Sequence, residues 1–500
     1  MADFLLPLDR DSPVALRDQL YRQLRQAILD CRLPAGGRLP STRSVAQQTG
    51  LARQTVVEAF DQLIAEGYVV SRPASGTYVT ETLPDQLLNV RSRQGRARHE
   101  TEAASHLSKR GSRLASVRIG ATPEYAGAPP FQTGTPALRE FPFELWARLT
   151  SRLLQSRPVE LLAYGEPGGY RPLREAIAAY LGAARAVRCT PDQIIVTAGA
   201  QQAMDLVARL LADPGDAAWL EEPGYVGARG ALGAAGLRLV PVAVDHEGLD
   251  VDAGRARCPH ARLVYVTPSR QYPLGVTMSL QRRRALLAWA QQAKAWVLED
   301  DYDSEYRYAG RPLASLQGLD EADRVVYLGT LSKVLFPSLR LGYIVAPPSL
   351  VESFKSVREL YGRHAPSLDQ AVLASFIAEG HLARHIRRMR RLYAERQAFF
   401  VRQCREHLSG LLDVAQVDAG MQLIGWLPEG VDDQAVSRCL GQHAIVTAPL
   451  SKHYLGEPPT RRGLLLGFGG YDERQVADAT ARMAEVLRSC QLSAVSFQQS

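Results

Sequence analysis

The chain of 500 residues lacks the cysteine patterns that build disulfide frameworks or zinc sites. Its six cysteines are scattered and no two form a CxxC pair, which is typical of a protein of the reducing cytosol. The N-terminal sequence MADFLLPLDRDSP carries acids where a secretory signal needs a cationic flank. No stretch free of charge reaches the ~20 apolar residues that span a bilayer. We therefore expect a cytoplasmic protein with no membrane segment, and the length predicts two or three domains.

Acidic residues are also absent from one stretch near the N-terminus. The net charge is +7, yet residues 1–82 balance nine arginines against nine acids. Within that region, the stretch 31–57 contains no acid but four arginines: Arg32, Arg38, Arg43 and Arg53. A segregated basic face can bind phosphates even where the net charge is zero.

The same region carries the pattern of a helix, a helix-turn-helix and a hairpin. Apolar residues at a spacing of four predict an amphipathic first helix: Leu16, Leu20, Leu24 and Ile28. Ser41 is placed to cap a short second helix that ends near Gly50. A third helix is predicted to bury one apolar face: Val56, Val57, Phe60, Leu63 and Ile64. The β-rich runs 68–70 and 77–79 then predict a hairpin.

This order of elements, in about 65 residues, predicts a winged helix-turn-helix. The start of its third helix, which enters the major groove in such domains, holds Arg53, Gln54 and Thr55, all able to bond base edges or phosphates. Arg43 and, in the wing, Arg72 are placed for the phosphate backbone. The alternative is a three-helix protein-binding module with solvated arginines, but the acid-free stretch coincides with the predicted contact face.

A family resemblance supports the DNA-binding interpretation. The segment GRLPSTRSVAQQTGLARQTVVEAFDQLIAEGYVVSRPASGTYV resembles the GntR family of bacterial winged-helix repressors nearly throughout. The resemblance implies double-stranded operator DNA as a partner. We place this DNA-binding domain at residues 14–82.

Residues 83–125 lack apolar periodicity and are predicted to form a flexible basic linker. Residues 83–118 hold eight Lys and Arg against three acids, and the sequence is poor in large apolar side chains, so it cannot build a core. Two interpretations remain open here. The linker either contacts DNA without reading sequence or is a plain solvated connector.

Residues 126–492 alternate apolar strand patterns with helical patterns. We predict strands at 193–198, 217–222, 262–267, 295–300, 324–329 and 339–346, with helices such as AQQAMDLVARLL and QRRRALLAWAQQA between them. Near-continuous apolar strands joined by helices predict a parallel-rich α/β sheet. In such sheets ligands bind beyond the carboxyl ends of the strands.

Polar residues gather at those predicted strand ends. VTAGAQ ends a strand and opens a helix whose free N–H groups suit a phosphate. LEEPGY carries Tyr225, LEDDYDSEY carries Asp300 and Asp301, and GTLSK carries Lys333. Taken alone, each of these residues is more often a surface or packing residue. Together they match pyridoxal 5′-phosphate (PLP). Its chemistry requires a lysine that forms an imine and a carboxylate that binds the pyridine nitrogen. It also requires a group that stacks on the ring and hydrogen-bond donors that bind the phosphate.

From about residue 126 to 490 the chain resembles a fold-type I aminotransferase, with a parallel-rich α/β/α sheet and a smaller C-terminal α+β subdomain. With the N-terminal domain attached, it resembles the MocR/GabR-type regulators of the GntR superfamily. The resemblance implies that Lys333 forms the Schiff base with PLP and that Asp300 pairs with the pyridine nitrogen. It further implies that Tyr302 bonds the 3′ oxygen of the ring and that Tyr225 stacks on the ring.

The same resemblance assigns the phosphate end of the cofactor and a second subunit. The implied phosphate ligands are Thr330, Ser332 and Arg340 together with the amides of Ala200 and Gln201. Tyr164, in AYGEPGGY, would reach the phosphate of a neighbouring subunit, which implies a homodimer.

Two departures from the family pattern concern recognition of the ligand. Relatives usually carry a TPSHQFP-like stretch, whereas this chain has TPSRQYP with Arg270 in place of the histidine. Aminotransferases commonly place a carboxylate-binding arginine in the strand before a GF-like pair, whereas this strand is GLLLGFGG. The candidates for binding an acidic effector group are therefore Arg461 and Arg462 just before that strand, and Arg229 after Tyr225.

Three functional hypotheses follow from the sequence. The first is a PLP-dependent transcriptional regulator that senses an amino compound or PLP itself. The second is an active aminotransferase whose DNA-binding domain only autoregulates it. The third is a binding protein in which PLP is structural. The groove-facing residues favour the first over the second, and the complete imine constellation disfavours the third.

Overall fold

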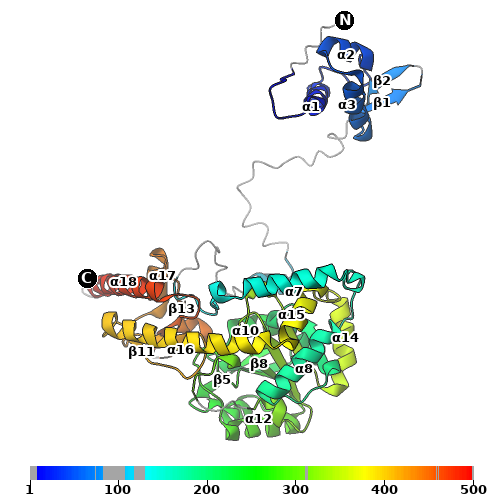
Figure 1. The fold of residues 1–500 in the computed structure, drawn as a ribbon. Helices are drawn as coiled ribbons and strands as arrows, with labels where there is room; N and C mark the ends of the chain where they lie inside the picture. Colours follow the sequence, from blue (N-terminus) through cyan, green and yellow to red (C-terminus); the bar gives the residue numbers. More distant parts are fainter. Residues whose placement is uncertain are drawn as a thin grey trace. The chain divides into compact units, whose positions relative to one another are not determined.

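The computed structural model describes residues 8–73, 75–82, 107–116, 130–309, 314–457, 459 and 461–497. These residues belong to two compact units that divide after Ser105. We call residues 8–82 the head and residues 107–497 the body (Figure 1).

The head is three helices followed by an antiparallel hairpin. Its elements are α1 (Leu16–Leu29), α2 (Thr42–Thr49), α3 (Arg53–Ala65), β1 (Val69–Arg72) and β2 (Gly76–Val79). Ser41 caps α2 as predicted, because its hydroxyl accepts from the Ser44 amide at 3.1 Å. Gly50 ends α2 in the left-handed conformation, with φ of 66°, which a glycine adopts without a Cβ penalty. The predicted winged helix-turn-helix order is confirmed.

The head core lies between α1 and α3. Leu20 and Leu24 of α1 pack with Val56, Phe60 and Leu63 of α3, and all are at most 3% exposed. The predicted apolar face of α3 is wrong at one position. Ile64 is 38% exposed, because it lies one helical step of about 100° from Leu63, at the edge of the buried stripe.

The predicted linker contains a helix. Within the predicted flexible linker the structure has α6 (Lys109–Ser116), which packs against α10 (Val226–Ala234). The Ser108 hydroxyl accepts from the Gly111 amide at 3.0 Å, and Arg110 Nε donates to the Ala234 carbonyl at 3.0 Å. A capping hydroxyl and a tertiary partner stabilise a helix too short to persist alone. Residues 83–106 and 117–125 of the predicted linker lie outside the described residues.

A sheet of eight strands forms the centre of the body. The strands are β3 (Ile194–Thr197), β4 (Ala217–Glu222), β5 (Arg238–Asp245), β6 (Gly248–Leu249), β7 (Leu263–Val266), β8 (Trp296–Asp301), β9 (Val325–Thr330) and β10 (Gly342–Val345). Their order is β3-β10-β9-β8-β7-β4-β5-β6. Strands β9, β8, β7, β4 and β5 are parallel, whereas β10 is antiparallel to both neighbours and β6 to β5.

All six predicted strands are present in this sheet, and the sequence missed β5. That strand contains Pro241, and a proline argues against a strand in the interior of a sheet. Its antiparallel neighbour β6 at the sheet edge is only two residues long, which explains why the sheet accommodates it.

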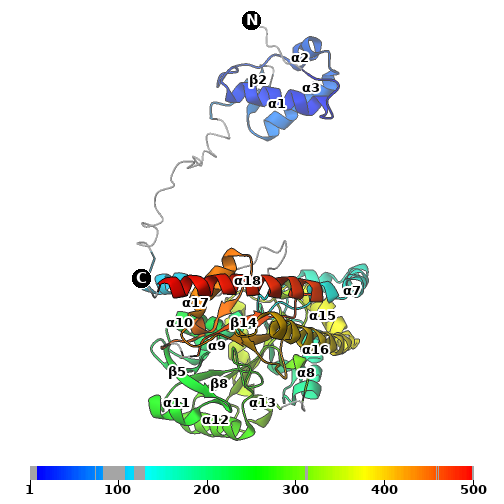
Figure 2. The same ribbon diagram turned by 90° about the vertical axis from the view of Figure 1, so that its left-hand side faces the viewer.

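Helices cover both faces of the sheet (Figures 1 and 2). They are α7 (Phe143–Gln155), α8 (Arg171–Arg185), α9 (Ala200–Leu211), α10, α11 (Val251–Arg257), α12 (Leu280–Ala293), α13 (Leu316–Leu319), α14 (Val351–Leu360) and α15 (Ser367–Ala378). One face carries α9, α10 and α14, and the other carries α8, α11, α12 and α13. The core under α12 includes stacked rings of Trp219 and Trp289, with centroids 3.7 Å apart.

A smaller α+β subdomain follows the large sheet. Its elements are α16 (His381–His407), β11 (Asp413–Val414), β12 (Gln422–Trp426), α17 (Asp433–Gln442), β13 (Ala448–Pro449), β14 (Gly463–Gly467) and α18 (Glu473–Phe497). The strands form an antiparallel sheet in the order β11-β12-β14-β13. Helix α16 contacts α15 at its start and α18 further along (Figure 2). The predicted two-part body is confirmed. No helix of the described residues is long and apolar enough to cross a membrane.

Candidate functional site

The candidate cofactor site forms where parallel strands end at one edge of the large sheet. Lys333 follows β9 by three residues and is largely buried. Its ammonium donates to the Gly134 carbonyl at 2.9 Å. Burial lowers the pKa of Lys333, while the nearby Asp303 and Asp300 oppose that shift. The lysine therefore meets the physical requirement for imine chemistry, a primary amine that loses its proton more readily than a surface lysine.

Gly134 is required for this approach. An ideal Cβ built on Gly134 would lie 2.5 Å from Lys333 Nζ, and φ at Gly134 is +73°. A side chain at this position would displace the lysine and strain the backbone. The turn Gln132–Gly134 is therefore part of the site.

Asp300 is the penultimate residue of β8 and is 4% exposed. Its Oδ2 accepts from the Tyr265 hydroxyl at 2.6 Å, whereas its Oδ1 is buried without a hydrogen-bond partner among the described residues. Burial raises the pKa of Asp300 to about 7. Its neighbour Asp301 is instead bonded by Arg185 at 2.7 Å. Of the two adjacent carboxylates, Asp300 is thus the one that lacks a cationic hydrogen-bond partner.

Tyrosine rings surround this carboxylate. Tyr225 is partly buried, and both Asp300 and Tyr272 raise the pKa of its hydroxyl beyond what burial alone does. The rings of Tyr225 and Tyr272 meet edge to face with centroids 5.5 Å apart, and Tyr272 meets Tyr302 likewise at 5.8 Å. The structure therefore brings both predicted ring contacts, Tyr225 and Tyr302, to the Asp300 edge.

The predicted phosphate residues lie at the neighbouring strand ends. Gly342 of β10 pairs with Thr330 of β9 on one side and with Thr197 of β3 on the other. This register sets the turn of Thr330 and Ser332 beside Gly199, the residue that opens α9.

Arg340 completes this group. Its guanidinium donates to the Ala198 carbonyl at 2.9 Å, and its Cζ would lie 3.6 Å from a Cβ built on Gly199. No described side chain caps the N-terminus of α9, which leaves the amides of Ala200 and Gln201 as anion donors in the field of the helix dipole.

These residues fit PLP. The unpartnered Oδ1 of Asp300 is an acceptor for a pyridine N–H, and the group of Thr330, Ser332, Arg340 and the α9 amides is a donor set for a phosphate dianion. Lys333 belongs to both groups, since its charge interacts with Asp300 and it follows Thr330 by three residues.

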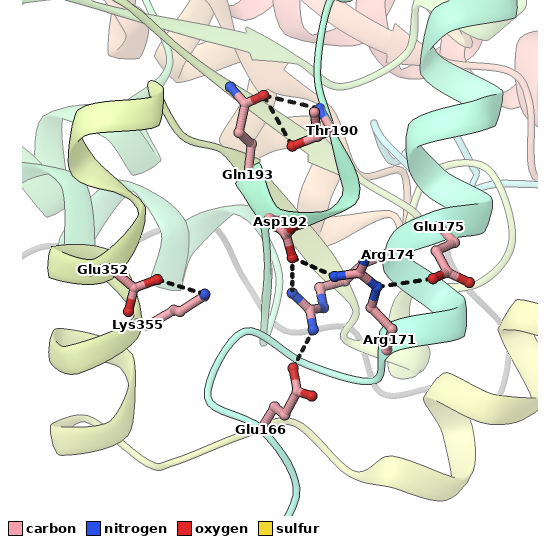
Figure 3. Close-up of polar contacts among 9 residues, drawn as sticks. All are labelled: Glu166, Arg171, Arg174, Glu175, Thr190, Asp192, Gln193, Glu352 and Lys355. Carbon is pink, nitrogen blue, oxygen red and sulfur yellow. Dashed lines mark hydrogen bonds and ion pairs between the residues drawn. The ribbon is translucent and has the colours of Figure 1, made fainter.

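Tyr164 lies apart from this group, on a loop before α8. It is 80% exposed, and the guanidinium of Arg363 lies over its ring at 4.3 Å. An ion-pair network fixes the loop (Figure 3). Glu166 pairs with the buried Arg174 of α8, whose guanidinium also lies 3.9 Å from Asp192. The structure thus holds Tyr164 in an outward-facing position within one chain.

Arg270, the departure from the family pattern, is buried between the two parts of the body. It donates to Asp303 and to the Tyr302 hydroxyl, both at 3.1 Å, and to the Gln422 carbonyl of β12 at 2.6 Å. These contacts give the Arg270 guanidinium one carboxylate partner and two neutral acceptors. Arg270 therefore orients Tyr302 and joins the large sheet to the small subdomain.

The three predicted effector arginines are committed to other contacts. Arg229 lies next to Tyr225, but it donates to the Tyr454 and Lys452 carbonyls at 3.2 and 2.7 Å. Arg461 pairs with Asp413 at 3.1 Å, and Arg462 pairs with Asp432 at 2.9 Å. Both Arg461 and Arg462 precede β14, whose buried positions are leucines, and their binding of an effector remains a prediction.

The candidate DNA-contact residues lie on the surface of the head. Arg53, Gln54 and Thr55 occupy the first turn of α3, with Arg53 and Gln54 exposed and Thr55 half-buried. Arg43 is exposed on the first turn of α2. Arg72 is exposed at the end of β1, with its guanidinium 4.7 Å from the Tyr78 ring centroid. Their contacts with DNA remain predictions.

Comparisons with known proteins match both units. Residues 16–79 match the family model described as bacterial regulatory proteins, gntR family, and residues 131–462 match aminotransferase class I and II. The probable rhizopine catabolism regulatory protein MocR of Rhizobium meliloti is 44% identical over 475 residues, which cover 95% of this chain and 94% of that protein. The chain belongs to the GntR-family transcriptional regulators that carry an aminotransferase class I and II domain. The pyridoxine biosynthesis regulator PdxR of Corynebacterium glutamicum is 30% identical to this regulator over 97% of this chain and 99% of PdxR.

Solved structures match the body of the regulator. A kynurenine aminotransferase of Pyrococcus horikoshii, in complex with PMP, aligns with a TM-score of 0.69 and 26% identity over 78% of this chain and 98% of that chain. An α-aminoadipate aminotransferase of Thermus thermophilus, complexed with N-(5′-phosphopyridoxyl)-L-leucine, aligns with a TM-score of 0.69 and 28% identity over 77% and 98%. The regulator therefore has the aminotransferase fold in its body.

The sequence missed several residues of the regulator's site. Tyr265 and Gly134 contact Asp300 and Lys333, and Tyr272 joins the two predicted tyrosines. Tyr265 stands inside an apolar strand pattern, where a tyrosine predicts packing. Gly134 stands in a small polar turn, QTGTP, and this turn was the feature of the sequence that could have pointed to it.

Proposed function

We propose that the protein is a PLP-dependent transcriptional regulator that senses a small amino compound or PLP itself through its aminotransferase-like body. The observation that carries this proposal is the proximity of Lys333, a largely buried amine, to Asp300, whose Oδ1 lacks a described partner. The same chain carries a GntR-type head. A DNA-binding unit and an amine-reactive pocket in one chain are the parts that a sensor requires.

When bound, PLP supplies an aldehyde that condenses with primary amines and a ring that takes up electrons. The chain supplies the groups that bind and orient it. Tyr265 donates to Asp300 Oδ2 and so leaves Oδ1 as the acceptor for the cofactor ring. A ring N–H at Oδ1 would stabilise the ionised form of Asp300, whose pKa burial alone raises to about 7. The Tyr302 hydroxyl, held by Arg270, would bond the 3′ oxygen of the ring.

The pocket supports sensing better than turnover. An aminotransferase must hold the carboxylate of each substrate firmly while a proton moves at the reacting carbon. Family members commonly use an arginine on the strand that is β14 here, but its core positions are Leu464, Leu465 and Leu466, all 0% exposed. Arg270, the other nearby cation, is already paired with Asp303. We therefore expect an amino compound to exchange at Lys333 with slow or absent turnover.

Helix α10 offers a route from the pocket to the linker. Tyr225 is its N-cap residue, and the Gln201 side chain of α9 donates to the Gly227 carbonyl in its first turn at 3.0 Å. At its other end, Ala234 accepts from Arg110 of the linker helix α6. The helix is nine residues long, or about 13 Å at 1.5 Å per residue. We propose that a shift of Tyr225 on ligand exchange moves this short rigid element and changes how α6 docks.

We further propose which partners the protein binds and in which compartment it works. The head would bind operator DNA through Arg53, Gln54 and Thr55 in the major groove, with Arg43 and Arg72 on phosphates. The exposed Tyr164 supports a homodimer in which it reaches the phosphate site of the neighbouring subunit. Operator binding implies work in the cytoplasm.

One experiment separates sensor from enzyme. An operator is first selected from random duplexes with the purified PLP-loaded protein. Keto-acid release with common amino donors and operator affinity with the same donors are then measured side by side. We expect at least one donor to shift the near-visible absorbance band and change operator affinity by tenfold or more, with no multiple turnover.

The alternative is an active aminotransferase with an autoregulatory head. Rapid multiple turnover together with operator affinity that ignores every amino ligand would establish that alternative. The docking of α6 has its own readout, since hydrogen exchange of residues 109–116 should change when the absorbance band shifts. If operator affinity responds to the ligand but hydrogen exchange of residues 109–116 does not change, the route through α10 would be excluded.

A further inference from the structure

Helix α16 presents a surface of arginines that the cofactor site does not use. Between His381 and Ala394 there are five arginines and no acid: Arg384, Arg387, Arg388, Arg390 and Arg391. All five are exposed. Arg384, Arg387, Arg388 and Arg391 follow the i, i+3, i+4, i+7 spacing that places side chains on one helix face. A surface groove of about 510 Å³ is lined by Arg384, Arg387, Arg390 and Arg391.

Much of this charge is not neutralised within the described body. Arg388 pairs with Glu140, and the guanidinium of Arg390 donates to the Glu305 carbonyl at 2.8 and 3.0 Å. Among the described residues, no carboxylate lies within ion-pair distance of Arg387 or Arg391. Two adjacent solvated guanidinium groups on a rigid helix repel each other, so the surface favours an anionic partner.

We propose that this α16 surface, defined by Arg384, Arg387 and Arg391, binds the phosphate backbone of double-stranded DNA outside the site that the head reads. The proposal rests on the proposed DNA binding by the head. Guanidinium groups bind phosphate oxygens with short, charge-assisted hydrogen bonds. An acidic protein is the less favoured partner, because the surface shows no apolar centre of the kind that protein interfaces bury.

The dimensions of the surface agree with a nucleic acid backbone. Residues 384 to 391 span about 10 Å along the helix axis at 1.5 Å per residue. Phosphates of one DNA strand recur about every 3.4 Å along the duplex axis, so the surface faces roughly three of them. It carries no aromatic or amide group to read bases. Binding is therefore expected to be independent of sequence and to depend strongly on salt.

The test uses the full-length protein and random-sequence duplexes of about 16 and 60 base pairs, the longer one offering sites beyond the head. Arg387→Gln with Arg391→Gln removes two charges that have no described ion pair. The matched control is Arg402→Gln with Arg405→Gln, two exposed arginines further along the same helix. We expect the slope of log K against log salt on the long duplex to fall by about two in the first variant and to stay unchanged in the control.

Three outcomes would overturn the proposal. Equal slopes for wild type and the Arg387 and Arg391 variant would show that the surface does not meet DNA. Equal losses in the control would show a general effect of net charge. A change of oligomeric state in the first variant alone would identify the surface as a contact between subunits. Failure of the proposed function looks different, because the wild type would then select no operator from random duplexes.

Discussion

The head and the body differ in where they keep their candidate functional residues. Arg43, Arg53 and Gln54 in the head are exposed on the first turns of short helices. Asp300 and Lys333 in the body are buried, where burial raises the pKa of the first and lowers the pKa of the second. A surface that binds DNA needs charges that water already solvates. A site that binds an amine-reactive cofactor needs titratable groups whose charged form the fold destabilises by burial.

This difference separates function from stability in one unit and couples them in the other. Substituting an exposed arginine in the head should weaken the predicted binding of DNA and leave the core unchanged. Substituting a buried carboxylate or lysine in the body changes the free energy of unfolding as well as cofactor binding.

The largest effect is expected for Lys333→Ala. Borohydride reduction of the wild type should attach the cofactor to the peptide that contains Lys333, and the variant should show neither that label nor the near-visible band. Operator binding should persist but no longer respond to PLP or effector. Lys355→Ala is the matched control, because Lys355 is partly exposed and pairs with Glu352 at 2.7 Å (Figure 3). A label on Lys294 or Lys355 in the wild type would overturn the assignment.

Replacing the two adjacent aspartates should have opposite effects on the PLP-free protein. Asp300→Asn removes a carboxyl group that burial disfavours in its ionised form, and we expect a gain of about 2–3 kcal/mol at pH 8. Asp301→Asn removes the partner of the buried Arg185 and should cost about 3–5 kcal/mol. Chemical denaturation measures both. A loss of stability in Asp300→Asn would show that this carboxylate is already compensated.

The gain in stability of Asp300→Asn should depend on pH. The pKa of Asp300 is raised from 3.8 to about 7 in the folded state, so wild-type folding is penalised as the carboxyl ionises. The advantage of the variant should grow as pH rises from about 4 to about 7 and stay constant above that. An advantage that shrinks over this interval would contradict the environment described for Asp300.

Arg53→Ala or Gln54→Ala should weaken specific operator binding by about 1–3 kcal/mol. Arg43→Ala should weaken binding to all sequences and lower the salt slope by about one. Fluorescence titration against selected and random duplexes distinguishes the two patterns, and thermal unfolding should not change. The control is Arg17→Ala, an exposed arginine of α1 that pairs with Asp18. Unaltered titrations in all three test variants would exclude the groove placement of α3.

The smallest effect is expected for Ser41→Ala, which removes the cap of α2. The loss should be about 1 kcal/mol and confined to the head. Hydrogen exchange of the α2 amides in the full chain measures it. Ser44→Ala is the control, because in this cap Ser44 contributes its backbone amide and not its hydroxyl. Equal protection of the α2 amides in Ser41→Ala and wild type would show that the Ser41 cap does not stabilise α2.

Local patterns accounted for most of the head. Its helices, the cap at Ser41 and the place of Arg53 at the start of α3 were predictable because each depends on residues within a few positions. In the body the continuous apolar strands were predictable for the same reason. The strand β5 was not, because Pro241 hides it, and the two-residue strands β11 and β13 are too short for any alternation to show.

The sequence alone predicted the candidate chemistry of the site: a lysine, a carboxylate and phosphate-binding side chains at successive strand ends. The partners of those groups depend on the tertiary structure. The Gly134 carbonyl accepts a hydrogen bond from Lys333, which lies 199 residues further along the chain. Tyr265 donates to Asp300, which lies 35 residues further along. The structure also assigned Arg270, Arg461 and Arg462 to their acidic partners. Contacts over such separations leave no periodic signal, because they depend on how separate elements pack and not on the spacing within any one of them.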